Sequence, residues 1–305
     1  MNYEHGISVV IPTYNSSRYI DKAIESVISF ANDMPFEIIC VDDQSDDKDE
    51  LHEVISKYKF SSVIVKKEKS NAAVSRNIGI ENSRFRWVFL LDSDDMLISD
   101  AAQRRIAIHE EQECGLIFGN YITVSNGNSI VSNYLWKNEN IRDFILLNGG
   151  DFRTSTISID KHHFKQTFFD PESFKHQDWI FGFKCFDNNE RMVFDQLPSA
   201  IINVDGESRM SSKINLSASR YLVTHYVSEQ KHKNGFSKKN WKNVIAANDS
   251  EARNFFFNLY LPNSEKEKLT FKAYRLASSG TLMPVCSVLL TMLRKIKWQL
   301  AKFRH

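Results

Sequence analysis

Apolar runs alternate with amphipathic stretches four times in the first hundred residues of the chain. Each run has the length of a strand and is followed by a polar turn and then by a stretch with helical spacing. In residues 17–30, for example, Ile20, Ile24 and Val27 recur on one helical face. The four runs occupy residues 7–11, 36–41, 62–65 and 87–91. This alternation predicts an α/β domain whose parallel sheet is covered by helices on both faces.

Carboxylates follow two of these runs directly. Asp42 and Asp43 come after the second run, and Asp92, Asp94 and Asp95 come after the fourth. Like charges held this close repel, and burying any of them unpaired costs several kcal/mol. A divalent cation removes that cost, and hard oxygen ligands suit Mg²⁺ or Mn²⁺. Because ligands of parallel sheets bind beyond the carboxyl ends of the strands, these acids predict a metal site that holds a diphosphate.

The acids also have a plainer interpretation as helix-start and loop residues. After the fourth run they would form a solvated loop that caps the next helix through Ser99 or Asp100. After the second run, Asp46 and Asp47 suit the positive end of a helix dipole. This interpretation fits Asp42 and Asp43 poorly, because they lie at the tip of the strand.

Four segments resemble, in order and in spacing, the motifs of family 2 glycosyltransferases. They are residues 8–15, 41–45, 75–79 and 91–95. The resemblance covers about the first third of the chain and continues weakly to about residue 212. It implies a GT-A fold and an inverting, metal-dependent enzyme that uses a nucleotide-sugar donor.

The resemblance also implies roles for individual side chains. Tyr14 would pack against the base, Asp43 would accept a hydrogen bond from it as in family members that use uridine donors, and Asp92 would contact the ribose. Asp94 would bind the metal. Arg76 would lie near the donor, although a structural ion pair explains it equally well. The residues assigned to the nucleotide sugar are Pro12, Thr13, Tyr14, Asp42, Asp43, Arg76, Asp92 and Ser93.

A catalytic base is the remaining requirement, because inversion needs a carboxylate that takes the proton from the acceptor hydroxyl. The family places this Asp in a Glu-Asp-Trp-like segment, and the match here is Gln177, Asp178 and Trp179. Asp178 is therefore expected to be the base, the alternative being a helix N-cap. Gln177 departs from the Glu that the family often has.

A second departure follows the base. Many relatives carry a His that completes the metal or diphosphate site, and Asp205 stands at the corresponding position. It would be a further metal ligand, or a turn residue beside Gly206. Residues 117–176, where contacts to the donor sugar and acceptor would lie, receive no roles from the sequence.

Composition narrows the class of protein and its compartment. The chain has 305 residues and a net charge of +1, which gives no signature of nucleic-acid binding. Its four cysteines are scattered without a CxxC pair, which predicts a reducing compartment. No basic and apolar leader opens the sequence, so no signal peptide is expected. Together these features favour a cytoplasmic enzyme.

The last ninety residues differ in character from the rest. Residues 1–215 are expected to form the GT-A-like domain and residues 216–305 a helical extension. No acidic residue follows Glu267, and residues 282–293 are strongly apolar. Residues 281–305 therefore suit a basic amphipathic helix at the anionic inner face of the cell membrane. The alternative is a helix that docks on the domain or on a second subunit of a homo-oligomer.

The expected activity is sugar transfer from a nucleotide sugar, most simply a UDP-sugar, to a glycan or lipid-linked acceptor hydroxyl. Its setting would be bacterial surface-polysaccharide assembly, including lipopolysaccharide or capsule. A nucleotidyltransferase would use the same groups, but it would carry a glycine-rich loop after the first strand, and residues 12–17 contain no glycine. A non-catalytic glycan- or partner-binding member of the fold is the third interpretation.

Overall fold

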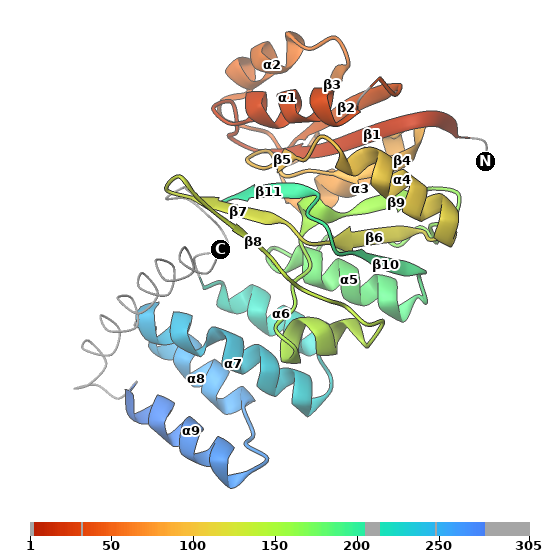
Figure 1. Cartoon of the computed structure of the whole chain (residues 1–305). Coiled ribbons are helices and arrows are strands. Elements are labelled where there is room, and N and C mark those ends of the chain that lie inside the picture. The colour runs from red at the N-terminus through yellow and green to blue at the C-terminus, as the bar shows by residue number, and fades with distance from the viewer. Residues whose placement is uncertain (1–2, 32, 205–213, 248, 278–305) are drawn as a thin grey trace. The chain divides into compact units, whose positions relative to one another are not determined.

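The computed structural model of the chain describes residues 3–31, 33–204, 214–247 and 249–277. The chain divides into two compact units (Figure 1). The first, called here the sheet unit, comprises Met1–Ile141 and Gly150–Asp205. The second, called the helical unit, comprises Arg142–Gly149 and Gly206–His305.

The sheet unit is built on a seven-stranded sheet with the order β10-β6-β9-β4-β1-β2-β3. β1 is parallel to β2 and β4, and β2 is parallel to β3. β9 is antiparallel to β4 and β6, so the sheet is mixed but mostly parallel. The strands are β1 (Glu4–Thr13), β2 (Phe36–Asp42), β3 (Ser61–Val65), β4 (Phe85–Leu90), β6 (Leu116–Gly119), β9 (Ser158–Asp160) and β10 (Met192–Asp195). The predicted α/β fold with four leading strands is confirmed.

A smaller sheet and five α-helices complete the sheet unit. The small sheet joins β5, β11, β7 and β8. Its strands are β5 (Met96–Leu97), β7 (Ile122–Ser125), β8 (Asn128–Val131) and β11 (Ala200–Asn203). The helices are α1 (Ile20–Ala31), α2 (Lys48–Ser56), α3 (Ala72–Asn82), α4 (Ala101–Gln112) and α5 (Gln177–Asp187), with a 3-10 turn η2 (Thr154–Thr156).

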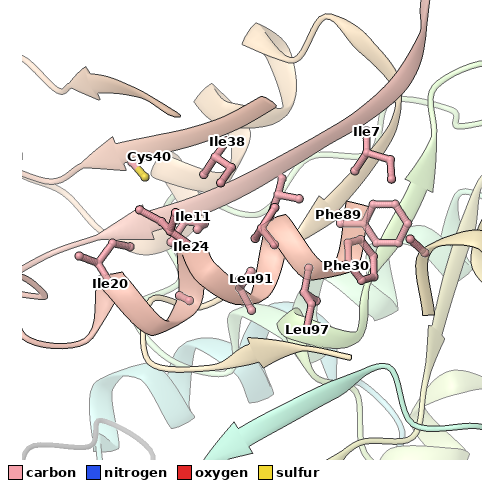
Figure 2. Close-up of a cluster of buried hydrophobic side chains, with 14 of the residues drawn as sticks. Ile7, Ile11, Ile20, Ile24, Phe30, Ile38, Cys40, Phe89, Leu91 and Leu97 are labelled. Atoms are coloured by element: carbon pink, nitrogen blue, oxygen red, sulfur yellow. The ribbon is translucent and has the colours of Figure 1, made fainter. Parts of the chain in front are cut away.

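The apolar periodicity of α1 builds one side of the core. Figure 2 shows its buried side chains meeting those of β1, β2 and β4, whose alternate residues point to this face. Phe30 of α1 and Phe89 of β4 meet edge to face with ring centroids 4.8 Å apart. Full burial of each such side chain contributes about 1.5–3 kcal/mol, so this packing holds α1 firmly on the sheet.

Helix α3 packs on the opposite face of the sheet. A Cβ added to Gly79 would lie 2.2 Å from Cγ1 of Val10, so only glycine allows α3 to approach β1 this closely. Asn71 caps the helix, and its side-chain oxygen accepts hydrogen bonds from the backbone N–H groups of Ala73 and Val74. The capped end lies at the carboxyl ends of the strands, which places Arg76 at that edge.

The helical unit gathers α6, α7, α8, α9 and a π-helical turn, η1. Their bounds are η1 (Asp143–Leu147), α6 (Leu216–Tyr226), α7 (Gln230–Ala247), α8 (Ser250–Leu259) and α9 (Glu265–Ala277). Buried aromatic side chains such as Phe236, Trp241 and Phe256 fill the space between them. His232 on α7 pairs with Asp143 of η1 at 2.6 Å, so a segment far earlier in the chain belongs to this unit.

Among the helices described here, none is both long and apolar enough to cross a bilayer. The predicted amphipathic segment, residues 281–305, lies outside the described residues, as does Asp205.

Candidate active site

The ends of the leading strands bring the predicted donor residues to one edge of the sheet. Thr13 at the end of β1 is in register with Asp42 at the end of β2. The backbone N–H of Asp43 donates to the carbonyl of Thr13 at 2.9 Å, and that of Leu91 donates to the carbonyl of Val10 at 3.0 Å. Three segments that are far apart in the sequence therefore meet where ligands of such sheets bind.

The carboxylates after β4 take two different environments. Asp95 is buried, and its side chain accepts hydrogen bonds from the Ser155 hydroxyl at 2.7 Å and the Asn203 backbone N–H at 3.1 Å. Burial, and then the charges of Asp92 and Asp94, raise the pKa of Asp95 well above its usual range. The solvated-loop interpretation is therefore wrong for Asp95, whose role is to tie this segment to η2 and β11.

Ser155 holds the same segment from a second side. Its hydroxyl oxygen accepts a hydrogen bond from the backbone N–H of Asp92 at 3.1 Å while donating to Asp95. Asp94 is exposed, and Asp92 and Ser93 are half-buried. Asp100 occupies the N-cap position of α4 but makes no capping hydrogen bond. The tethered loop thus presents Asp94 to solvent at the strand end.

The metal expectation can be tested against these side chains. Within the described part of the chain, no group of three or more His, Cys, Asp or Glu side chains could hold a cation by itself. Mg²⁺ is, however, usually bound through one or two carboxylates together with substrate phosphates and waters. An exposed Asp94, beside acids whose charges repel one another, fits a cation that arrives with a diphosphate.

Arg76 connects this loop to the start of α5. Its Nη2 donates to Oδ1 of Asp92 at 2.7 Å, and its Nη1 donates to Oε1 of Gln177 at 2.7 Å. Gln177 in turn donates to the carbonyl of Ser173 at 2.7 Å. The guanidinium is buried, so it needs such partners. The ion pair anticipated for Arg76 exists, and it lies between the strand-end loop and the predicted base segment.

Asp42 and Asp43 differ in what they leave open. Oδ1 of Asp42 accepts hydrogen bonds from the backbone N–H and the hydroxyl of Ser45 at 3.1 and 2.6 Å, and the residue is fully buried. Oδ1 of Asp43 accepts from Lys66 Nζ at 2.6 Å and from the backbone N–H of Ser70 at 2.7 Å. Oδ2 of neither carboxylate accepts a hydrogen bond from the described residues, but that of Asp42 is enclosed and lies 3.4 Å from His52 Nε2. Asp42 therefore serves the turn.

The aromatic ring predicted to meet the base is exposed and held by charged neighbours. Nζ of Lys69 lies 3.9 Å from the ring centroid of Tyr14, whose hydroxyl donates to Asp46 at 3.2 Å. Pro12 is half-buried and Thr13 is buried. The Thr13 hydroxyl has no hydrogen-bond partner in the part of the chain that the structure describes. One face of an aromatic side chain and an unsatisfied hydroxyl therefore stand at the end of β1.

Asp178 lies in the first turn of α5. The N-cap of this helix is His176, so the N-cap interpretation of Asp178 is wrong. Its Oδ1 accepts a hydrogen bond from the backbone N–H of Trp179 at 2.9 Å. Burial raises the pKa of Asp178 to about 6, Arg153 lowers it, and Asp151 adds to the rise. A carboxylate with a pKa near the working pH is suited to general-base catalysis.

Asp151 is a hydrogen-bonded carboxylate near Asp178 to which the sequence gave no role. Its Oδ2 accepts from the Tyr121 hydroxyl at 2.9 Å and from Arg153 Nε at 2.7 Å. Its Oδ1 accepts from Trp179 Nε1 at 3.1 Å and from the backbone N–H of Phe152 at 3.0 Å. No local pattern marks a lone Asp after two glycines, and the proximity to Trp179 is created only by folding.

Comparison with known proteins identifies the family. The sequence profile described as "Glycosyl transferase family 2" matches residues 8–168, which include Arg76 and the segment 92–95 but not Asp178. Poly(ribitol-phosphate) beta-N-acetylglucosaminyltransferase TarP of Staphylococcus aureus (strain N315) is 36% identical over 129 residues, or 41% of this chain and 39% of TarP. Amylovoran biosynthesis glycosyltransferase AmsB of Erwinia amylovora is 30% identical over 187 residues, or 56% of this chain and 61% of AmsB.

A solved structure agrees with the fold. The crystal structure of S. aureus TarS 1-349 in complex with UDP-GlcNAc matches with a TM-score of 0.60 and 18% identity, covering 95% of this chain and 92% of that one. The chain spans less than two thirds of the length of TarP and AmsB. Because the family profile matches more than half of the chain, and the architecture agrees, the chain belongs to glycosyltransferase family 2.

Proposed function

We propose that the chain is an inverting glycosyltransferase that transfers a sugar from a UDP-sugar to an acceptor hydroxyl during bacterial surface-polysaccharide biosynthesis. The observation that carries this proposal is the double hydrogen bond of Arg76 to Asp92 and Gln177. It joins the strand-end loop, where the donor would bind, to the helix that bears Asp178. A displacement reaction requires both within one site.

The donor would bind at the ends of β1 and β2. Tyr14 and Pro12 offer contact surface to a base, and Oδ2 of Asp43 can accept a hydrogen bond from the uracil N–H. The Thr13 hydroxyl is buried beside this surface without a hydrogen-bond partner among the described residues, and Asp92 with Ser93 would contact the ribose. Asp42 would contribute indirectly, because its hydrogen bonds to Ser45 hold the turn that follows β2. The UDP-GlcNAc complex of TarS supports a uridine donor.

Asp94 would hold a Mn²⁺ or Mg²⁺ ion together with the diphosphate, and Asp205 would add a second carboxylate. When bound, such a cation neutralises charge that develops on the leaving diphosphate. Arg76 would lie beside the donor and keep Asp92 oriented, because its Nη2 is already bonded to that carboxylate.

Asp178 would be the base. It would take the proton of the acceptor hydroxyl as that oxygen forms a bond to the anomeric carbon on the face opposite the diphosphate. The bond between the anomeric carbon and the diphosphate oxygen breaks, UDP leaves with the electron pair, and the configuration inverts. The raised pKa of Asp178, about 6, supports this role because the group is ionised yet basic near neutral pH.

The acceptor class is suggested by the relatives. TarP is named for poly(ribitol-phosphate) and AmsB for amylovoran biosynthesis. We therefore propose a glycan or a lipid-linked glycan as acceptor, with lipopolysaccharide and capsule among the candidate products. A basic amphipathic segment at residues 281–305 supports action at the cytoplasmic face of the membrane.

A screen of nucleotide sugars tests the donor. The chain is heated with each of several UDP-, GDP- and dTDP-sugars, with and without Mn²⁺, and hydrolysis is measured in parallel. A true donor at a hundredfold excess over its Kd should stabilise the fold by about 2.7 kcal/mol. Stabilisation by a GDP- or dTDP-sugar but by no UDP-sugar would contradict the assignment of a uridine donor.

A further inference from the structure

The carboxylate of Asp151 accepts hydrogen bonds from the side chains of Tyr121, Arg153 and Trp179. Two side chains share its Oδ2, the hydroxyl of Tyr121 at 2.9 Å and Nε of Arg153 at 2.7 Å. The indole N–H of Trp179 reaches its Oδ1 at 3.1 Å. The side chain of Asp151 is 11% exposed. The group formed by Asp151, Tyr121, Arg153 and Trp179 is called here the Asp151 network.

The network borders the proposed base directly. Trp179 follows Asp178 in the chain, so anchoring its indole fixes the first turn of α5. Arg153 is the cation that acts most strongly on the Asp178 carboxylate, and its guanidinium is aimed by Asp151. Nothing else in the proposed mechanism uses this network.

We infer that Asp151 is a positioning residue of the transfer reaction: by holding Arg153 and Trp179 it keeps the Asp178 carboxylate oriented and beside a fixed cation. The inference rests on the proposed function, in which Asp178 is the base. A residue that acts through another in this way contacts neither donor nor acceptor. Its removal should alter how Asp178 ionises, which a purely structural ion pair would not do.

The direction of each change follows from charge. The charged groups that act on Asp178 are Arg153 and Asp151, just before η2, and Arg76 on α3. Asp151→Asn removes a negative charge and leaves Arg153 unpaired, so both effects favour the ionised form of Asp178. Arg153→Gln removes the cation and leaves Asp151 uncompensated, so both effects favour the protonated form. The two substitutions should therefore shift the Asp178 titration in opposite directions.

The chain provides a matched control. Asp160 on β9 is also a buried carboxylate, and Arg86 donates two hydrogen bonds to it at 2.9 and 2.7 Å. It is not among the main groups that act on Asp178. Asp160→Asn should lower Tm, as loss of any buried pair does, without moving the titration of Asp178.

The experiment is a ¹³C NMR titration of the Asp carboxyl carbons in the full-length chain, with the Asp178 signal assigned by its loss in Asp178→Asn. We expect the midpoint to fall by about half a pH unit or more in Asp151→Asn and to rise comparably in Arg153→Gln. Asp160→Asn should leave it in place. A midpoint unchanged in both network variants, or moved equally by Asp160→Asn, would overturn the inference; if Asp151→Asn does not fold, Arg153→Gln decides alone.

The activity of the wild type and of each variant is measured as the Mn²⁺-dependent hydrolysis of UDP-glucose and UDP-N-acetylglucosamine. The acidic limb of its pH profile should follow the NMR midpoints, and Asp151→Asn should lower kcat about tenfold because the base is less well aligned. Full activity of Asp178→Asn would reject both the base and this inference. An inactive Asp178→Asn beside network variants with unshifted limbs and unchanged kcat would reject only the inference.

Discussion

Arg76 on α3 and Asp92 in the loop that follows β4 form a hydrogen-bonded ion pair with a distance of 2.7 Å. The side chain of Arg76 is 6% exposed and that of Asp92 is 36% exposed, so a buried cation is neutralised by a carboxylate that still reaches solvent. The other end of the guanidinium bonds to Gln177. Since Asp92 already compensates Arg76, an uncharged amide is sufficient at position 177.

Arg76→Lys should break the hydrogen-bonded link between Asp92 in the loop after β4 and Gln177 at the start of α5. Lysine keeps the charge but lacks the fork that binds Asp92 and Gln177 together. We expect the affinity for the UDP-sugar found in the thermal screen to fall about tenfold and Tm to fall as well, because one buried partner is left unpaired. Calorimetric titration of the folded variant measures the affinity. Wild-type affinity at a lowered Tm would make Arg76 structural only.

Asp94→Ala should abolish transfer, and EDTA should abolish it in the wild-type chain. Asp94 is the exposed carboxylate after β4, and in the proposed function it shares a cation with the diphosphate. Activity is measured after dialysis against EDTA and again after excess Mn²⁺ is added. Rescue of the wild type but not of the variant is the expected pattern, and undiminished transfer in chelator would exclude the metal.

Asp178→Asn should leave donor affinity near that of the wild type while transfer falls by about 10²-fold or more. The amide is nearly isosteric but cannot accept a proton at neutral pH. In the wild type, kcat should decline as the pH falls through about 6, because the base becomes protonated. If donor affinity collapses in the variant, Asp178 belongs to the donor site instead.

The same substitution should affect stability in a pH-dependent way. The pKa of Asp178 is higher in the folded chain than in the unfolded one, so the folded state binds more protons between the two values. The contribution of this group to stability is therefore present at low pH and is lost as the pH rises through about 6. Asp178→Asn should raise Tm relative to wild type at pH 8 and much less at pH 4. Equal Tm differences at both values would argue against a raised pKa.

Deletion of residues 281–305 should release the chain from anionic liposomes while the sheet unit stays folded. Each Lys or Arg near an anionic surface contributes about 1 kcal/mol to binding, and exposed charges are screened within about 8 Å at physiological salt. Flotation should thus weaken at high salt and on neutral liposomes. If the segment docks on protein instead, truncation should lower Tm or change the oligomer, with equal flotation of both forms.

Local patterns in the sequence were sufficient to predict the fold, and they pointed to the edge of the sheet at which the donor site is proposed. Strand periodicity placed β1 to β4, because alternation of apolar residues reflects burial wherever the sheet forms. The acids directly after two strands were expected at one edge of the sheet, and β1, β2 and β4 are parallel and bring them there. The motif resemblance pointed to a family that the comparison with known proteins then identified.

The burial of each of these side chains, and the partners it contacts, could be learned only from the tertiary structure. Asp92, Asp94 and Asp95 look equivalent in sequence, but only the structure buries Asp95 against Ser155 and leaves Asp94 exposed. Arg76 meets Gln177 from 101 residues away. Asp151 accepts hydrogen bonds from Tyr121 and Trp179, which lie far from it in the sequence. The physical reason is that burial and pairing depend on neighbours in space, and a linear pattern records only neighbours in the chain.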